Sequence, residues 1–235
     1  MSSAAASLDR GKADGRGSPF RVERVRPARE RLLEAMLAAV GELGYERATV
    51  QQVIERARAS RATFYRNFSD KEDCFAQAHG LLADWVYARL AAAARRKQLW
   101  REQLRAALSE ALEMCANQPA FARALIVEPL TAGGQAREKH EWLLERLSED
   151  LDEARRESTG ETPPQSTSAF TLGAIETLLR GKLMAREVDE TRELLPTLLY
   201  LAVMPYFGEA AAWEEIMAAP LAGWESRRIA SSERP

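Results

Sequence analysis

Cysteine and histidine are scarce in this chain, which has two of each among its 235 residues. Cys74 and Cys115 lie in helical patterns, and two cysteines do not suggest a disulfide framework. We interpret both as small buried apolar residues in a reducing cytoplasm, with a redox-sensing pair as the alternative. His79 and His140 have no second ligand at metal spacing, so we expect neither a metal nor a cofactor.

Long hydrophobic runs are also missing from the sequence. No segment approaches the roughly 18 apolar residues that a membrane-spanning helix needs, and the N-terminus lacks the apolar core of a secretory signal. The sequence contains no recognisable pair of nucleophile and base, no phosphate-binding glycine loop and no set of metal ligands. We therefore expect a cytoplasmic protein that is not an enzyme and does not bind membranes.

Charge is distributed unevenly along the chain. Residues 1–71 hold 14 Lys and Arg against 9 Asp and Glu, and the remainder holds 19 against 26, although the whole chain is near neutral at −2. A basic front suits a protein that places one end on a polyanion, with a chance imbalance as the alternative. Residues 1–24 have almost no large apolar groups, so we expect a disordered basic arm, either a solvated tail or an arm that contacts DNA.

Residues 49–75 carry the strongest pattern in the sequence. Apolar side chains recur at helical spacing from Val50 to Ala57, and Thr49 is placed to cap this short helix. A tight turn follows at residues 58–59, and Ser60 can cap a second short helix. The pattern predicts two short helices joined by a tight turn.

The second short helix has two different faces. Phe64 and Phe68 point one way, and small, hydroxyl, amide and guanidinium groups point the other. The second face suits a DNA major groove, because Ala and Thr allow close approach while Arg and Asn bond base edges. Ser69 is expected to cap a third helix, and a bound phosphate would explain Lys71 in its first turn. The predicted DNA contacts are Thr49, Arg61, Ala62, Thr63, Tyr65, Arg66, Asn67 and Lys71.

The run from Arg29 to Phe75 resembles the helix-turn-helix domain of the TetR family of transcriptional repressors. Arg58 and Ala62 depart from the family pattern, which usually has Gly at both positions. The resemblance implies an all-α fold, with an N-terminal three-helix DNA-binding domain and a larger helical domain for ligand binding and dimerisation. The matching residues are Gly44-Tyr45, Thr49, Ile54, Ala57, Ser60, the run from Thr63 to Phe68, and Lys71-Glu72.

The remaining helices follow from apolar periodicity and breakers. The first begins after Pro27, carries an inward stripe at Leu32, Met36, Ala39, Val40 and Leu43, and ends where Gly44 adopts a left-handed α conformation. Later helices are expected at about 70–97, 99–117, 119–130, 135–157, 168–186, 189–207 and 209–218, with a loop at 158–166. The predicted organisation is a basic arm (1–24), a helix-turn-helix domain (25–72), a helical regulatory and dimerisation domain (73–220) and a flexible tail (221–235).

The helices expected at 168–186 and 189–207 are apolar on two sides, so they need two layers to pack against. The simplest second layer is the same pair from another copy about a twofold axis, and the alternative is a cover formed by residues 209–218. A twofold homodimer also places two DNA-reading helices on the two half-sites of a palindromic operator, and TetR-like proteins dimerise in this way. The expected interface residues are Ala174, Leu178, Gly181, Leu198 and Leu199.

The resemblance also implies that the larger domain holds a small apolar effector of unknown identity, whose binding spreads the two DNA-binding heads. Arg123 and Glu128 lie on an otherwise apolar helix, and each buried charge needs a partner: the other, a neighbouring helix or a ligand. The favoured function is a sequence-specific transcriptional regulator, a dimeric repressor of double-stranded DNA released by the effector. The alternative is a helical enzyme or a non-DNA interaction module. The candidate lining residues are Trp85, Met114, Phe121, Arg123, Leu125 and Phe170, for which ordinary core packing is the alternative.

Overall fold

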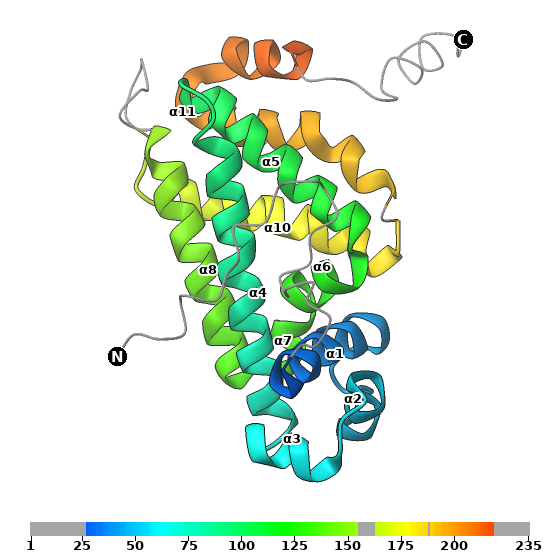
Figure 1. Ribbon diagram of the computed structural model, residues 1–235. Coiled ribbons are helices and arrows are strands. Elements are labelled where there is room, and N and C mark those ends of the chain that lie inside the picture. The colour runs from blue at the N-terminus through cyan, green and yellow to red at the C-terminus, as the bar shows by residue number, and fades with distance from the viewer. Residues whose placement is uncertain (1–26, 155–162, 188, 219–235) are drawn as a thin grey trace, which may run out of the picture. The chain divides into compact units, whose positions relative to one another are not determined.

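The computed structural model of the chain describes residues 27–154, 163–187 and 189–218. Every regular element in these ranges is a helix (Figure 1), which confirms the all-α prediction. The expectations for residues 1–24 and 221–235, and for most of the loop at 158–166, fall outside the described residues. The helices are α1 Ala28–Leu43, α2 Val50–Ala57, α3 Arg61–Asn67, α4 Lys71–Ala94, α5 Trp100–Asn117, α6 Pro119–Ile126, α7 Glu128–Ala132, α8 Gly134–Asp152, α10 Thr167–Ala185, the 3-10 helix η2 Asp189–Leu194, and α11 Leu195–Ala218.

The chain forms two compact units, each with its own core. Within the described residues, the first unit comprises 27–89 and Asn117–Glu145, and the second comprises Leu90–Ala116, 146–154, 163–187 and 189–218. The first unit therefore contains α1 to α3, most of α4, α6, α7 and the beginning of α8. The second contains most of α5, the end of α8, α10, η2 and α11.

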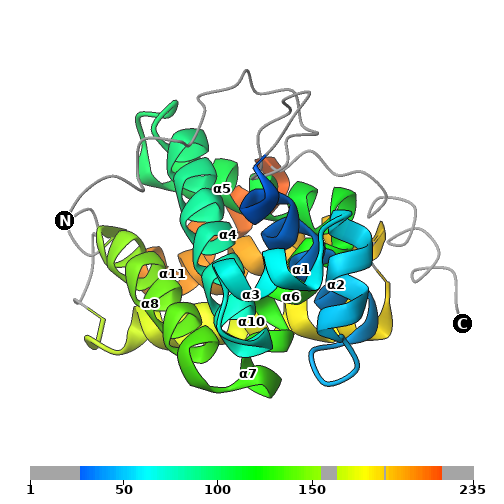
Figure 2. The same cartoon turned by 60° about the horizontal axis from the view of Figure 1, so that its bottom comes forward.

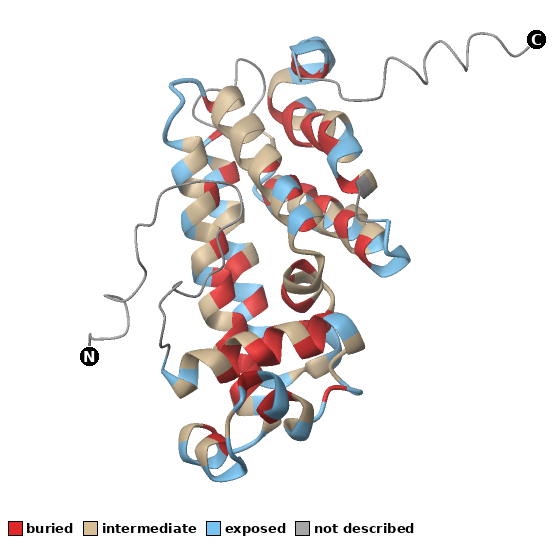
Figure 3. Cartoon of the chain, turned by 45° about the vertical axis from the view of Figure 1, so that its right-hand side comes forward, coloured by how far each residue is buried: buried red, intermediate tan, exposed pale blue. Residues whose placement is uncertain are grey.

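Helix α1 is the central brace of the first unit, and its residues are buried on more than the single stripe that periodicity predicts (Figure 3). Leu33 and Leu37 are as completely buried as the predicted Leu32 and Met36, because α6 packs along α1 in addition to α2. Gly41 makes the approach of α6 possible, since a Cβ there would lie 1.9 Å from the carbonyl oxygen of Ala120. A side chain at this position would force the two helices apart.

Two predicted helix ends differ in detail from the structure. Gly44 ends α1 with a positive φ of 88°, but its ψ of 152° is extended rather than left-handed α. The N-cap of α4 is Asp70 rather than Ser69, because Asp70 Oδ1 accepts a hydrogen bond from the Asp73 amide at 2.8 Å. Asp73 in turn accepts from the Ser69 amide at 2.8 Å, so Ser69 stands one residue outside the helix.

The helix predicted at 119–130 is broken at Val127 into α6 and α7, and Pro129 supplies the physical reason. Proline has no N–H to donate to the carbonyl of the residue four positions earlier, here Leu125. The Leu125 carbonyl is instead bonded by His79 Nε2 of α4 at 3.2 Å. Because a carbonyl only accepts, this contact places the ring proton of the buried His79 on Nε2.

The second unit is built around α10 and α11. One face of α10 is buried at Ile175, Leu179 and Leu183. A backbone break at Gly208, with φ 81°, divides α11 where the sequence predicts two separate helices. Beyond the break, ion pairs join the buried Glu215 to α5: Arg105 contacts it directly, and Arg101 lies 3.5 Å away. Residues 209–218 are therefore held against α5 as part of this unit's own core.

Candidate nucleic-acid interface

Hydroxyl caps fix the beginnings of the two short helices that the sequence singled out. The Thr49 hydroxyl accepts from the Gln52 amide at 3.3 Å, and the Gln52 side chain accepts from the Thr49 amide at 2.8 Å, which together form a capping box. Ser60 Oγ accepts from the Thr63 amide at 3.1 Å and so begins α3. Both caps predicted from the sequence are confirmed, and they orient α3 relative to α2 (Figure 2).

The outward face of α3 carries the side chains expected to read DNA. Arg61, Ala62, Tyr65 and Arg66 are exposed, whereas Phe64 and Phe68 are buried in the core as predicted. The Arg61 guanidinium lies 5.8 Å from the centre of the Tyr65 ring, so these two side chains support each other at the start of the face. The Arg66 side chain lies exposed to solvent on the same face.

Two of the predicted contact residues on α3 are half-buried. Asn67 donates its side-chain amide to the backbone carbonyl of Thr63 at 2.7 Å. A bidentate contact to adenine needs both the donor and the acceptor of an Asn side chain, so it would require this bond to open. The Thr63 hydroxyl lies 2.8 Å from Ser60 Oγ, within the cap itself. The structure therefore gives both residues local roles, and their contact with DNA stays a prediction.

Lys71 has an intramolecular role that the sequence did not indicate. Its Nζ donates to the carbonyl of Tyr45 at 3.0 Å and to that of Ala48 at 3.3 Å, and it lies 4.1 Å from the centre of the Tyr45 ring. These contacts hold the loop between α1 and α2 to the first turn of α4. A bound phosphate is therefore not needed to explain a cation at this position.

Two arginines of α1 brace the helix-turn-helix, and apolar periodicity gave no sign of either. Arg31 Nε donates to the carbonyl of Ala57 at 3.0 Å and so closes the C-terminal end of α2. Arg29 donates to Gln77 of α4 and lies 5.7 Å from the centre of the Phe68 ring. Arg31 thus holds the end of α2, Arg29 packs against Phe68 at the end of α3, and neither belongs to the exposed face of α3.

A buried polar network joins the α6–α7 junction to the end of α1. Glu128, which is 4% exposed, accepts from Arg123 Nη2 at 3.2 Å and from the backbone amide of Tyr45 at 2.8 Å. Arg123 Nε also donates to the carbonyl of Gly41 at 2.9 Å. The two charges on the apolar helix are thus partners of each other, which was one of the options left open by the sequence. We call this network of Gly41, Tyr45, Arg123 and Glu128 the α1–α6 latch.

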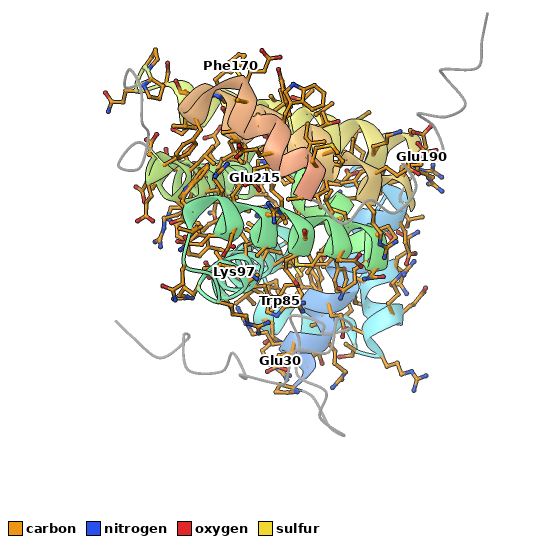
Figure 4. All side chains as sticks on the ribbon, turned by 90° about the horizontal axis from the view of Figure 1, so that it is seen from above. Glu30, Trp85, Lys97, Phe170, Glu190 and Glu215 are labelled. Atoms are coloured by element: carbon orange, nitrogen blue, oxygen red, sulfur yellow. The ribbon has the colours of Figure 1, made fainter. Side chains whose placement is uncertain are left out.

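The residues predicted to line an effector site are divided between the two units. Trp85, Phe121 and Leu125 belong to the first unit, and Met114 and Phe170 belong to the second. Trp85 is half-buried beneath the Arg89 guanidinium, which lies 5.0 Å from the ring centre. Phe170 is 80% exposed on α10 (labelled in Figure 4), so it is a surface residue in one copy of the chain rather than part of a core. Arg123 is engaged in the latch.

The predicted interface residues fall into two groups. Ala174 and Leu178 are partly exposed and Gly181 is exposed on α10. Leu198 and Leu199, by contrast, have no exposed area because the chain's own core surrounds them. A second copy cannot contact these two leucines directly, which removes them from the expected interface and assigns them to the interior of the second unit.

Metal, thiol and membrane expectations have separate outcomes. In the described part of the chain, no group of three or more His, Cys, Asp or Glu side chains is placed to hold a metal ion. Cys74 and Cys115 are buried free thiols, and burial raises the pKa of Cys115 to about 12, which leaves little reactive thiolate.

The stretch Glu190–Ala218 is long and apolar enough to cross a membrane by length and composition. This corrects the expectation that no segment of the chain is long and apolar enough to do so. Core helices pass the same test.

Comparison with known proteins connects this geometry to a family. Residues 32–78 match the sequence family described as bacterial regulatory proteins, tetR family. No curated protein sequence matches the chain significantly. The match to the tetR family covers α2, α3 and most of α1, together with the first residues of α4. It therefore includes the capped turn and the exposed face described above.

Solved structures resemble the fold over most of the chain. A TetR-like transcriptional regulator from Rhodococcus sp. RHA1 is 20% identical, with a TM-score of 0.56 over 83% of this chain and 100% of that one. FadR from Bacillus subtilis, solved with stearoyl-CoA, is 17% identical, with a TM-score of 0.61 over 74% and 96%. SmeT, the repressor of the Stenotrophomonas maltophilia efflux pump SmeDEF, is 18% identical, with a TM-score of 0.62 over 78% and 91%. Residues 32–78 thus match the tetR family of bacterial regulatory proteins, and the chain around them has the fold of the TetR-like regulator from Rhodococcus.

Proposed function

We propose that this chain is a dimeric transcriptional repressor that reads a palindromic operator with α3 and releases it when an apolar ligand binds the helical domain. One observation carries the proposal: the exposed face of α3 is basic and carries Arg61, Tyr65 and Arg66, while its other face is held in the core by Phe64 and Phe68. A rigid helix with an outward Arg66 suits direct reading of base edges in a major groove. The predicted boundaries at 25–72 and 73–220 and the cytoplasmic location belong to the same proposal.

An exposed apolar stripe on α10 supports the dimer. Phe170 and Met184 are 80% and 62% exposed, and Gly173, Leu178 and Gly181 lie between them along the helix. No atom lies within 4 Å of the position that a Cβ would take at either glycine, so another helix could approach closely there. A mostly apolar face of this kind, which also includes the exposed Thr177, is typical of an interface. We expect α10 to pack against α10 of a second copy about a twofold axis, which would supply two DNA-reading heads.

The α1–α6 latch supports a link between effector and DNA. Arg123 and Glu128 flank the break between α6 and α7, and both bond to backbone atoms at the C-terminal end of α1. A displacement of α6 would therefore pull directly on the loop that leads into α2. A ligand can shift this arrangement only if it binds one position of α6 better than the other. We propose that the effector acts by binding one position of α6 more tightly than the other.

The comparisons support an effector with an apolar portion and a role as a repressor. FadR from Bacillus subtilis was solved with stearoyl-CoA, and SmeT is a repressor of an efflux pump. We propose a ligand with a substantial apolar portion, held among helices that include Phe121 and Leu125. Stearoyl-CoA serves as the first probe, and decanol serves as a neutral control for the anionic headgroup.

A gel-shift assay with fragments of the DNA flanking the coding region tests the proposed function. Wild-type protein should retard a fragment that carries an inverted repeat, and sedimentation of the complex should give two chains per repeat. Titration of the probe ligand should free the DNA and raise the melting temperature of the protein. If no double-stranded fragment is bound at low salt, or if the bound species contains one chain, the dimeric repressor is the wrong assignment.

A further inference from the structure

Arg58 occupies a backbone conformation that a side chain makes unfavourable. It ends α2 with φ 48° and ψ 49°, in the left-handed α region. Among the described residues, the other non-glycine residue with positive φ is Arg186, which ends α10 with φ 60° and ψ 26°. An L-residue in this region brings its Cβ too close to the following carbonyl oxygen, and glycine avoids that contact. The turn of the helix-turn-helix therefore tolerates a strained residue where glycine would fit without strain.

The backbone of this turn is held firmly although its conformation is unfavourable. The Arg58 amide donates to the carbonyl of Glu55 at 3.2 Å, and the Ala59 amide donates to that of Ile54 at 3.0 Å. Ser60 then caps α3 within two residues. Arg58 is therefore fixed in position at the point where the chain enters α3, so its side chain leaves the turn from a defined place.

The guanidinium of Arg58 is exposed and bonds to no other described residue, whereas several cations near it are engaged within the chain. Arg56 pairs with Glu42 on the surface. Arg31 bonds the end of α2, and Lys71 bonds the loop before it. Arg58 thus gives no interaction within the chain that would offset the strain of its backbone, and its charge stays available for a partner outside the chain.

We propose that Arg58 is a phosphate-binding residue, which contacts the DNA backbone beside the base pairs that α3 reads. The inference rests on the proposed DNA-binding function and adds a contact that departs from the glycine usual at this turn. Arg58 lies three residues before Arg61, which places its Cα within about 11 Å of the first residue of α3 along the chain. A guanidinium at that place makes a charge-assisted bond to a phosphate oxygen without reading the base sequence.

The two left-handed arginines form a matched pair for the test. Arg58→Gly and Arg186→Gly remove the same kind of strain, but position 186 belongs to the second unit and lies outside the helix-turn-helix. Both variants should lower the unfolding equilibrium constant, by roughly two- to fivefold, because glycine relieves the strain and its own flexibility offsets part of the gain. Arg58→Asn tolerates the same backbone without the charge, and Arg58→Lys keeps the charge.

DNA affinity is measured by fluorescence anisotropy across a salt series, on a duplex that the wild-type protein selects from a random library and on a scrambled duplex. For Arg58→Gly and Arg58→Asn, affinity for both duplexes should fall by roughly fivefold per head at physiological salt, and the salt slope should decrease by about 0.9 per head. Arg58→Lys should recover the slope, and Arg186→Gly should match the wild type.

Three results would overturn the assignment, and they separate it from the function on which it rests. If Arg58→Asn binds both duplexes with the wild-type salt slope while the wild type binds its selected duplex, Arg58 does not contact phosphate and the DNA-binding function stands. If Arg58→Asn loses affinity on the selected duplex alone, the residue reads bases instead. If the wild type binds neither duplex at any salt concentration, the proposed function fails and takes this inference with it.

Discussion

Glu128→Gln is the substitution that most directly perturbs the α1–α6 latch. It keeps the size of the side chain and one amide oxygen, but it removes the charge that faces Arg123 across 3.2 Å and weakens the acceptor for the Tyr45 amide. The Arg123 side chain is 19% exposed and that of Glu128 is 6% exposed, so water screens this pair poorly. Breaking one side of a buried ion pair costs about 3–5 kcal/mol, and the retained amide oxygen lowers that cost. We expect the free energy of unfolding to fall by roughly 2–3 kcal/mol.

Urea denaturation followed by circular dichroism measures this loss, with Glu46→Gln as the control. Glu46 is exposed in the same loop, so its variant should stay within about 0.5 kcal/mol of the wild type. The m-value should be unchanged if the loss belongs to the native state. A loss of less than about 1 kcal/mol for Glu128→Gln would show that the latch does not join α6 to α1, and the proposed route from effector to DNA would lose its physical basis.

Three further predictions follow from individual contacts. Burial is the main reason why the pKa of His79 is lowered to about 4, and repulsion from His140 adds to it. The folded ring therefore stays neutral at pH values where the unfolded ring gains a proton, below about pH 6.5. The protein should lose roughly 2 kcal/mol of stability between pH 8 and pH 5, and the His79→Gln variant should lose less over that interval in matched urea titrations. Lys71→Met should lower stability by about 1–2 kcal/mol in urea denaturation and leave the salt slope of DNA binding unchanged, whereas a slope reduced by about 0.9 per head would restore Lys71 as a phosphate contact. Phe170→Glu should yield a well-folded monomer by sedimentation velocity, because Phe170 is exposed in one copy, and a wild-type protein that already sediments as a monomer would refute the α10 interface.

Local sequence was sufficient to predict the helix-turn-helix. The caps at Thr49 and Ser60 and the inward Phe64 and Phe68 depend on residues a few positions apart, so periodicity and hydroxyl placement identify them. The same local rules did not indicate the intramolecular role of Lys71, whose partners are two carbonyls more than twenty positions earlier in the chain. The path of that loop is set by tertiary packing, which no local pattern contains.

The helical domain was predicted less completely because its decisive contacts are long-range. Apolar content suggested one helix from 119 to 130, and the effect of Pro129 on the carbonyl of Leu125 became clear only with His79 beside it. Buried and interface leucines have the same sequence signature, so Leu198 and Leu199 were assigned to a second copy although the chain's own core surrounds them. The strain at Arg58, by contrast, was signalled by the absence of the glycine usual at the turn.

Binding of Arg66→Ala to the selected and the scrambled duplex tests the central claim most directly, because Arg66 stands exposed on α3 and its truncation leaves the core untouched. The account predicts a loss of roughly 1–3 kcal/mol per half-site on the selected duplex and a much smaller loss on the scrambled one. Equal losses on the two duplexes would make Arg66 a phosphate contact and would contradict the assignment of α3 as the helix that reads the operator.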